Sequence, residues 1–187
     1  PSGFVFGYNW IMILVVMGVS GSGKTTIGRL LADELGWEFL DGDDYHSAAN
    51  REKMSRGIPL DDADRAGWLE TLAGLLRERL ERGESAVLAC SALKERYRQV
   101  LRASGAEQVK FVYLKGDADL IAARMRARPG HYMKAGMLAS QFSDLEEPQD
   151  ALVVDITLTP EEIKRRIREF VALNMTNDGA NNKGIET

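Results

Sequence analysis

Residues 18–25 read Gly18-Val19-Ser20-Gly21-Ser22-Gly23-Lys24-Thr25. They form a complete G-x-x-x-x-G-K-[ST] phosphate-binding loop. Its glycines let the backbone curl so that N–H groups point at a phosphate, and the helix that begins near Lys24 adds its positive dipole end. In such a loop Lys24 reaches the β- and γ-phosphates, and the hydroxyl of Thr25 binds Mg²⁺. We therefore assign this loop, with Thr26, to ATP and Mg²⁺.

Apolar runs and amphipathic stretches alternate on both sides of this loop. The apolar runs are mostly continuous, which suits strands buried on both faces of a parallel sheet. The candidate strands are Ile11–Met17, Glu38–Leu40, Ala86–Cys90, Lys110–Leu114 and Ala151–Ile156. The predicted helices are Lys24–Leu35, Asp62–Arg82 (stopped by Gly83), Leu93–Ala103, Asp117–Ala127 and Pro160–Leu173 (capped by Thr159 and Glu162). This alternation predicts an α/β fold with a parallel sheet.

Size, charge and cysteine content narrow the class of protein. The chain has 187 residues, which suggests one domain, and its net charge of -4 argues against general nucleic-acid binding. Its single cysteine, Cys90, lies in an apolar run and is expected to be a buried hydrophobe. The apolar run Trp10–Met17 is too short to span a bilayer. We expect a cytoplasmic protein with neither a nucleic-acid nor a membrane partner.

Two aspartates follow the second candidate strand, in the segment Phe39-Leu40-Asp41-Gly42-Asp43-Asp44. The carboxyl ends of parallel strands face the ligand crevice, and residues two apart in an extended chain point the same way. We expect Asp41 to hold Mg²⁺ through water and Asp43 to accept the proton of an attacking hydroxyl. In the alternative interpretation these aspartates only cap the next helix. The third candidate strand has no acidic residue at its end, which favours Asp41 as the metal-side group.

A basic segment stands out in this acidic chain. It reads Arg124-Met125-Arg126-Ala127-Arg128-Pro129-Gly130-His131-Tyr132-Met133-Lys134. Arg124 and Arg128 share one helix face, and the Pro-Gly pair breaks the helix. We expect a lid at about 124–134 that brings both arginines to the transferring phosphate, with Arg124 also binding nucleotide and His131 packing or contacting substrate. The alternative is a solvated helix end.

No N-K-x-D guanine-reading motif follows the fourth candidate strand, where the chain reads Lys115-Gly116-Asp117. This absence favours a kinase over a nucleotide-dependent switch, which would hydrolyse slowly without dependence on an acceptor. Asp155 ends another apolar run. It either lies near an adenine pocket or has a structural role.

Together these residues resemble the gluconokinase family. The resemblance spans about Met12 to Leu173 and rests on the loop, on D-G-D-D-Y-H at 41–46, N-R-E-K-M at 50–54, G-I-P-L-D-D-A-D-R at 57–65, C-S-A-L-K at 90–94, R-P-G-H-Y at 128–132 and L-A-S-Q-F at 138–142. It implies a nucleoside-monophosphate-kinase-like fold with a five-stranded parallel sheet and a lid. It also implies a homodimer in many members, and transfer of phosphate from ATP, with Mg²⁺, to the 6-hydroxyl of D-gluconate. The kinase domain would then be 12–173, between an N-terminal extension or expression remnant at 1–11 and a disordered, Asn- and Gly-rich tail at 174–187.

A gluconate pocket needs a cation for the carboxylate and polar groups for the hydroxyls. The carboxylate candidates are Arg51, Lys94 and Arg98, although Arg98 is equally compatible with a solvated helix face. The hydroxyl candidates are Asp43, His46 and Ser91, with Asp41 and His131 completing the expected substrate contacts and Tyr45 and Trp68 as possible walls. Trp68 also suits a place in the core. Shikimate, a nucleoside monophosphate or adenylyl sulfate are alternative acceptors for the same loop.

Overall fold

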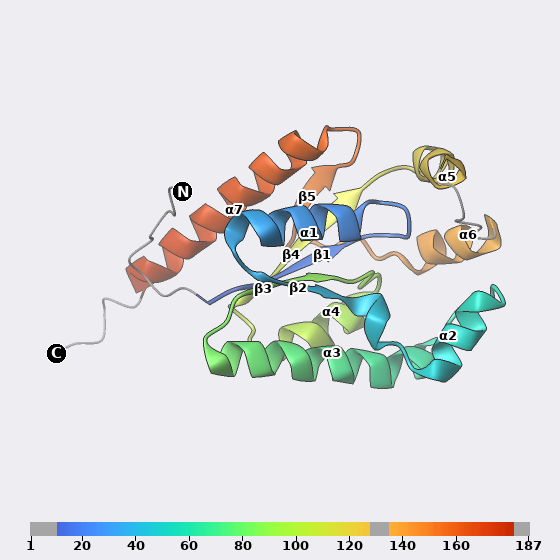
Figure 1. The fold of residues 1–187 in the computed structure, drawn as a ribbon, viewed down its shortest axis with the longest axis horizontal. Coiled ribbons are helices and arrows are strands. Elements are labelled where there is room, and N and C mark those ends of the chain that lie inside the picture. The colour runs from blue at the N-terminus through green and yellow to red at the C-terminus, as the bar shows by residue number, and fades with distance from the viewer. Residues whose placement is uncertain (1–10, 128–134, 182–187) are drawn as a thin grey trace.

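The computed structural model describes residues 11–127 and 135–181, and its centre is a parallel sheet (Figure 1). The sheet has five strands in the order β2-β3-β1-β4-β5, and every neighbouring pair is parallel. The strands are β1 Ile13–Met17, β2 Glu38–Asp41, β3 Ala86–Ala89, β4 Val109–Lys115 and β5 Leu152–Asp155. All five predicted strands are therefore confirmed, with ends that differ by one or two residues.

Helices cover both faces of this sheet. Figure 1 shows α1 and α7 on one face, α3 and α4 on the other, and α2, α5 and α6 gathered at one end. The helices are α1 Lys24–Leu35, α2 Ala48–Ser55, α3 Asp62–Arg82, α4 Glu95–Arg102, α5 Ala118–Arg126, α6 Ala135–Asp144 and α7 Pro160–Asn181, with a 3-10 turn η1 at Gly42–Tyr45. The predicted α/β fold is confirmed, whereas η1, α2 and α6 were not predicted. Within the described residues no helix is long and apolar enough to cross a membrane.

The alternating side chains of β1 divide the core into two layers. Leu14 and Val16 pack in a cluster with residues of α1 and α7, and Ile13, Val15 and Met17 pack in a second cluster with residues of α3 and α4. All five side chains are fully buried. This two-sided burial explains why β1 reads as a continuous apolar run rather than an alternating one.

Two helix ends confirm the local signals in the sequence. Gly83 ends α3 in the left-handed conformation, with a φ of 74° that suits glycine. At the start of α7, the backbone N–H of Glu162 donates to Thr159 Oγ1, and the backbone N–H of Thr159 donates to a Glu162 carboxylate oxygen. These reciprocal bonds form the predicted capping box.

The end predicted for the last helix is wrong, because α7 continues past Leu173 to Asn181. The side-chain amide of Asn174 donates to the carbonyl of Phe170 at 2.8 Å, and Met175 packs against the first core cluster. These contacts extend the helix into the segment 174–181, for which we expected disorder. Residues 1–10 and 182–187 lie outside the described residues.

Candidate active site

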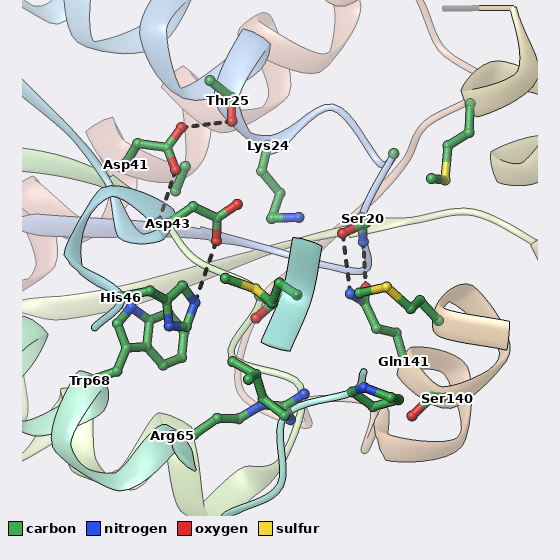
Figure 2. Close-up of a pocket in the computed structure, with 18 of the residues that line it drawn as sticks. Ser20, Lys24, Thr25, Asp41, Asp43, His46, Arg65, Trp68, Ser140 and Gln141 are labelled. Atoms are coloured by element: carbon green, nitrogen blue, oxygen red, sulfur yellow. Dashed lines mark hydrogen bonds and ion pairs between the residues drawn. The ribbon is translucent and has the colours of Figure 1, made fainter. Parts of the chain in front are cut away.

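A cavity of about 560 Å³ opens at the carboxyl ends of β2 and β3, beside the phosphate-binding loop (Figure 2). Its walls come from the loop, η1, the start of α3 and α6. The predicted site residues that line it are Ser20, Gly21, Gly23, Lys24, Thr25, Thr26, Asp41, Asp43, His46 and Ser91. Segments far apart in the sequence therefore meet at one small-molecule-sized site, at the sheet edge where parallel strands present ligands.

Glycine conformation shapes the phosphate-binding loop. Gly23 precedes α1 with a φ of 99°, and Gly21 has a φ of 83°. A Cβ on Gly21 would lie 2.7 Å from Cγ of Met125, so a side chain there would meet both backbone strain and a clash. Glycine at these positions permits the tight curl that turns backbone N–H groups inward.

Lys24 is the first residue of α1 and crosses the loop. Its Nζ donates to the carbonyl of Val19 at 3.0 Å. Burial lowers the pKa of Lys24, while the carboxylate of Asp43 opposes that shift. The ammonium therefore lies inside the loop and faces the cavity that Asp43 lines.

Thr25 and Asp41 lie side by side, as the sequence predicts for a metal site. Thr25 Oγ1 donates to Asp41 Oδ2 at 3.0 Å, and the backbone N–H of Asp43 donates to Asp41 Oδ1 at 3.2 Å. Asp41 thus caps η1, as the alternative interpretation predicts, and its second carboxylate oxygen lies beside the Thr25 hydroxyl. A hydroxyl beside a carboxylate fits Mg²⁺, which takes few protein ligands and completes its shell with water and phosphate oxygens. Among the described residues, no group of three or more His, Cys, Asp or Glu side chains is placed to hold a metal ion.

Asp43, His46 and Trp68 form one wall of the cavity. The Asp43 side chain is 80% exposed, and its Oδ1 lies 3.9 Å from Nε2 of His46. His46 stacks on Trp68 with ring centroids 4.3 Å apart, and Trp68 Nε1 donates to the carbonyl of Gly42 at 2.7 Å. Trp68 is therefore both a core residue and a cavity wall.

His46 is buried in this wall, and its Nδ1 has no hydrogen-bond partner among the described residues. Burial lowers the pKa of His46, and the carboxylate of Asp43 offsets part of that effect. The imidazole is accordingly neutral near pH 7, and its Nε2 lies on the side of Asp43.

None of the three predicted carboxylate candidates lines the cavity. Arg51 is exposed and donates to the backbone carbonyl of Asp44 at 3.2 Å. Lys94 forms ion pairs with Asp62 at 3.2 Å and Asp144 at 3.1 Å.

Arg98 neither lines the cavity nor lies on a solvated helix face, the two environments that the sequence left open. Its side chain is 1% exposed, and its Nη1 donates to the carbonyls of Ala92 and Leu93, each at 3.0 Å. Its other donors pair with Glu95 at 2.8 and 2.9 Å. The solvated interpretation is therefore wrong, because Arg98 braces the loop after β3, where Ala92 has a φ of 43°.

The predicted lid falls partly outside the described residues, including Arg128 and His131. Arg124 lies on α5 outside the cavity lining, and its Nη2 donates to the carbonyl of Ile156 at 2.6 Å. Asp155 accepts from both the N–H and the hydroxyl of Thr157 at 2.7 Å, which supports its structural interpretation.

Among the cavity residues to which the sequence assigned no role are Arg65 and Gln141. Arg65, in the first turns of α3, lines the cavity opposite the loop, and Gln141 reaches it from α6. Gln141 Oε1 accepts from the backbone N–H of Ser20 at 2.7 Å, and its Nε2 donates to Ser20 Oγ at 3.2 Å. Both residues stood in segments that carried the family resemblance, which was the available signal for them.

The phosphate-binding loop, the Thr25–Asp41 pair and an open carboxylate facing one cavity define a P-loop kinase acting on a small molecule. Residues 13–152 match the family model described as AAA domain. The gluconokinase of Arabidopsis thaliana is 44% identical over 174 residues, which cover 86% of this chain and 92% of that protein. The chain belongs to the gluconokinase family.

Solved structures agree with this assignment. A sugar kinase from Janibacter sp. is 45% identical with a TM-score of 0.81, covering 87% of this chain and 95% of that one. A gluconokinase from Sinorhizobium meliloti 1021 is 38% identical with a TM-score of 0.78, covering 88% of this chain and 97% of that one. The fold and the family thus agree along most of both chains.

Proposed function

We propose that this protein is a gluconokinase, which transfers the γ-phosphoryl group of ATP to the 6-hydroxyl of D-gluconate and releases ADP and 6-phospho-D-gluconate. The observation that carries the proposal is the convergence of Lys24, the Thr25–Asp41 pair and Asp43 on one cavity, in a chain of this family. A small polar cavity suits a polyol acid better than a macromolecule.

In the proposed reaction the loop residues 18–26 cradle the phosphates, and Lys24 places its charge where negative charge develops. Thr25 and Asp41 would hold Mg²⁺, which would supply positive charge against the phosphates. Asp43 accepts the proton of the 6-hydroxyl as that oxygen attacks. Its exposed carboxylate points into the cavity, where an acceptor alcohol can reach it.

Substrate hydroxyls are held on the same wall. His46 offers its Nε2, which lies on the Asp43 side of the ring, and Ser91 offers its hydroxyl just after β3. Buried polar groups that are paired only when every hydroxyl is present discriminate against analogues that lack one. We also propose that Arg124, Arg128 and His131 act through a lid that closes over the nucleotide, and that the protein is a cytoplasmic homodimer.

An assay of ADP release against a panel of acceptors tests the proposal. The panel contains D-gluconate, shikimate, AMP and adenylyl sulfate, each with Mg²⁺ and ATP. We expect turnover with gluconate, loss of turnover without Mg²⁺, and no turnover in the Lys24→Ala control. Turnover with another acceptor alone would replace the substrate. Slow hydrolysis that no acceptor accelerates would favour the nucleotide-dependent switch.

A further inference from the structure

The cavity has two cationic side chains among the described residues that line it, Lys24 and Arg65. Lys24 belongs to the phosphate-binding loop and is assigned to the phosphates of ATP. Figure 2 shows Arg65 well separated from Lys24. Asp43 and His46 lie between them in this view, along one wall of the cavity. A negatively charged acceptor would therefore meet Arg65 at the part of the cavity away from the transferring phosphate.

Arg65 is fixed in place by the fold. It follows the capping box of Asp61 and Asp64, which sets the first turn of α3. Its Nη1 donates to Tyr97 Oη and to Asp144 Oδ2, each at 3.3 Å, and its guanidinium lies 5.5 Å from the centroid of the Tyr97 ring. The side chain is only 13% exposed. Such a constrained guanidinium loses little conformational entropy when it binds an anion.

Its hydrogen-bonding capacity is only partly used. All hydrogen bonds that its guanidinium makes to the described residues come from Nη1, so Nε and Nη2 have no partner among those residues. These two donors form the edge of the guanidinium that binds a carboxylate through two parallel hydrogen bonds. Asp144 does not depend on Arg65 alone, because Lys94 also pairs with it at 3.1 Å. A second carboxylate can therefore approach Arg65 without leaving Asp144 uncompensated.

We infer that Arg65 binds the carboxylate of the acid substrate and sets the preference for an acid over a neutral polyol, an inference that rests on the proposed function. With the carboxylate on Arg65, the hydroxylated chain passes the Nε2 side of His46, and its far hydroxyl reaches Asp43. The bound anion thus selects both the substrate class and the end of the molecule that is phosphorylated.

The test compares D-gluconate with D-gluconamide, its neutral amide, in the wild type and in Arg65→Ala, Arg65→Gln and Arg65→Lys. Arg77→Ala, an exposed arginine on the same helix, is the matched control. We expect kcat/KM for gluconate to fall about 10²-fold or more in Arg65→Ala, because a desolvated charge pair loses one partner. Turnover of gluconamide and KM for ATP should change by less than about threefold, so the preference for the acid disappears.

Arg65→Lys should recover part of the gluconate activity, since a point charge replaces the two-pronged contact. Arg65→Gln keeps a donor near Tyr97 and replaces the alanine variant if that variant does not fold. Calorimetric titration of wild type and variant with gluconate and with gluconamide then compares their affinities without turnover. Equal losses for gluconate and gluconamide would overturn the inference and leave Arg65 a structural residue, with the proposed function intact. A wild type that does not phosphorylate gluconate would overturn both.

Discussion

At the scale of single residues, the neighbouring carboxylates of Asp41 and Asp43 differ in their hydrogen bonds and in their exposure. Both oxygens of Asp41 accept hydrogen bonds, from Thr25 and from the backbone N–H of Asp43. Asp43 keeps its carboxylate free of hydrogen bonds within the described residues and is mostly exposed to the cavity. This difference favours Asp43 over Asp41 as the proposed proton acceptor.

Replacement of Asp43 by asparagine should therefore lower kcat about 10²-fold or more, because the amide cannot accept the proton of the attacking hydroxyl. KM for ATP should stay within about twofold. Steady-state kinetics of Asp43→Asn, beside Asp44→Asn as the neighbouring exposed control, measures both constants. A change confined to KM for gluconate would make Asp43 a substrate-positioning residue instead.

The buried imidazole of His46 couples stability to pH. Its folded-state pKa is lowered by burial below the ordinary value of 6.5. Below pH 6.5 the unfolded chain therefore binds a proton that the folded protein does not, and the free energy of unfolding falls as the pH drops from 6.5 toward the folded-state pKa. The slope contributed by one such group is at most about 1.4 kcal/mol per pH unit.

Urea unfolding at pH 7.5 and pH 5.5 checks this expectation. The wild type should lose more stability on acidification than His46→Gln, which has no imidazole to protonate. Carboxylates with lowered pKa, such as Asp64, contribute equally in both proteins and mostly at lower pH. Equal losses in the two proteins would contradict the assignment to His46.

At the scale of elements, α6 is linked to the phosphate-binding loop. Gln141 of α6 accepts a hydrogen bond from the backbone N–H of Ser20 (Figure 2). This N–H belongs to the phosphate-binding loop, whose backbone N–H groups are expected to bind phosphate. We therefore expect a bound phosphate to compete with Gln141 for this N–H. We expect Gln141→Ala to bind an ATP analogue about fivefold more tightly, because a typical hydrogen bond contributes about 1 kcal/mol.

Isothermal titration of the ATP analogue with Mg²⁺ measures this affinity. Ser143→Ala, an exposed serine on the same helix, is the control and should match the wild type. Weaker binding by Gln141→Ala would show instead that the glutamine itself contacts the nucleotide.

The helices that sequence patterns predicted differ physically from those they did not. α1 and α3 have several buried apolar side chains in a helical repeat, and that pattern is visible without a structure. α2 buries only Asn50, whose amide donates to the carbonyl of Asp64 at 2.7 Å. A helix held by such a tertiary contact leaves no apolar periodicity to read.

The same reasoning separates the site residues. The loop and the aspartates after β2 are local signals, because neighbouring residues and a strand end suffice to place them. The roles of Arg65 and Arg98 depend on which way α3 and α4 face. Arg98 turns inward to carbonyls of its own loop, whereas Arg65 faces the cavity. Neither orientation follows from residue spacing, since both helices carry several arginines.

At the scale of the whole molecule, the site joins the centre of the sheet to one edge, so ligands should stabilise the entire fold. The loop follows β1 in the centre, and the acidic pair follows β2 at the edge. A ligand at 100 times its Kd adds about 2.7 kcal/mol to the free energy of unfolding. For a chain of this size we expect Tm to rise by about 5–10 °C.

Calorimetric scans with a non-hydrolysable ATP analogue, Mg²⁺ and gluconate measure this rise. Removal of Mg²⁺ with a chelator should reduce it, and Lys24→Ala should lose the part due to nucleotide. An unchanged Tm at saturating concentrations of both ligands would contradict a joint site.

Because the one cysteine of the chain is buried, a dye can be attached selectively to a cysteine introduced elsewhere, and ligand binding can then be followed by fluorescence. Cys90 is 1% exposed, and burial raises the pKa of its thiol to about 12, so almost no thiolate forms at neutral pH. Thiol-directed dyes react through the thiolate. A cysteine introduced on the outer surface of α6 would accordingly be labelled selectively in the native protein, with Cys90 left unmodified in the core.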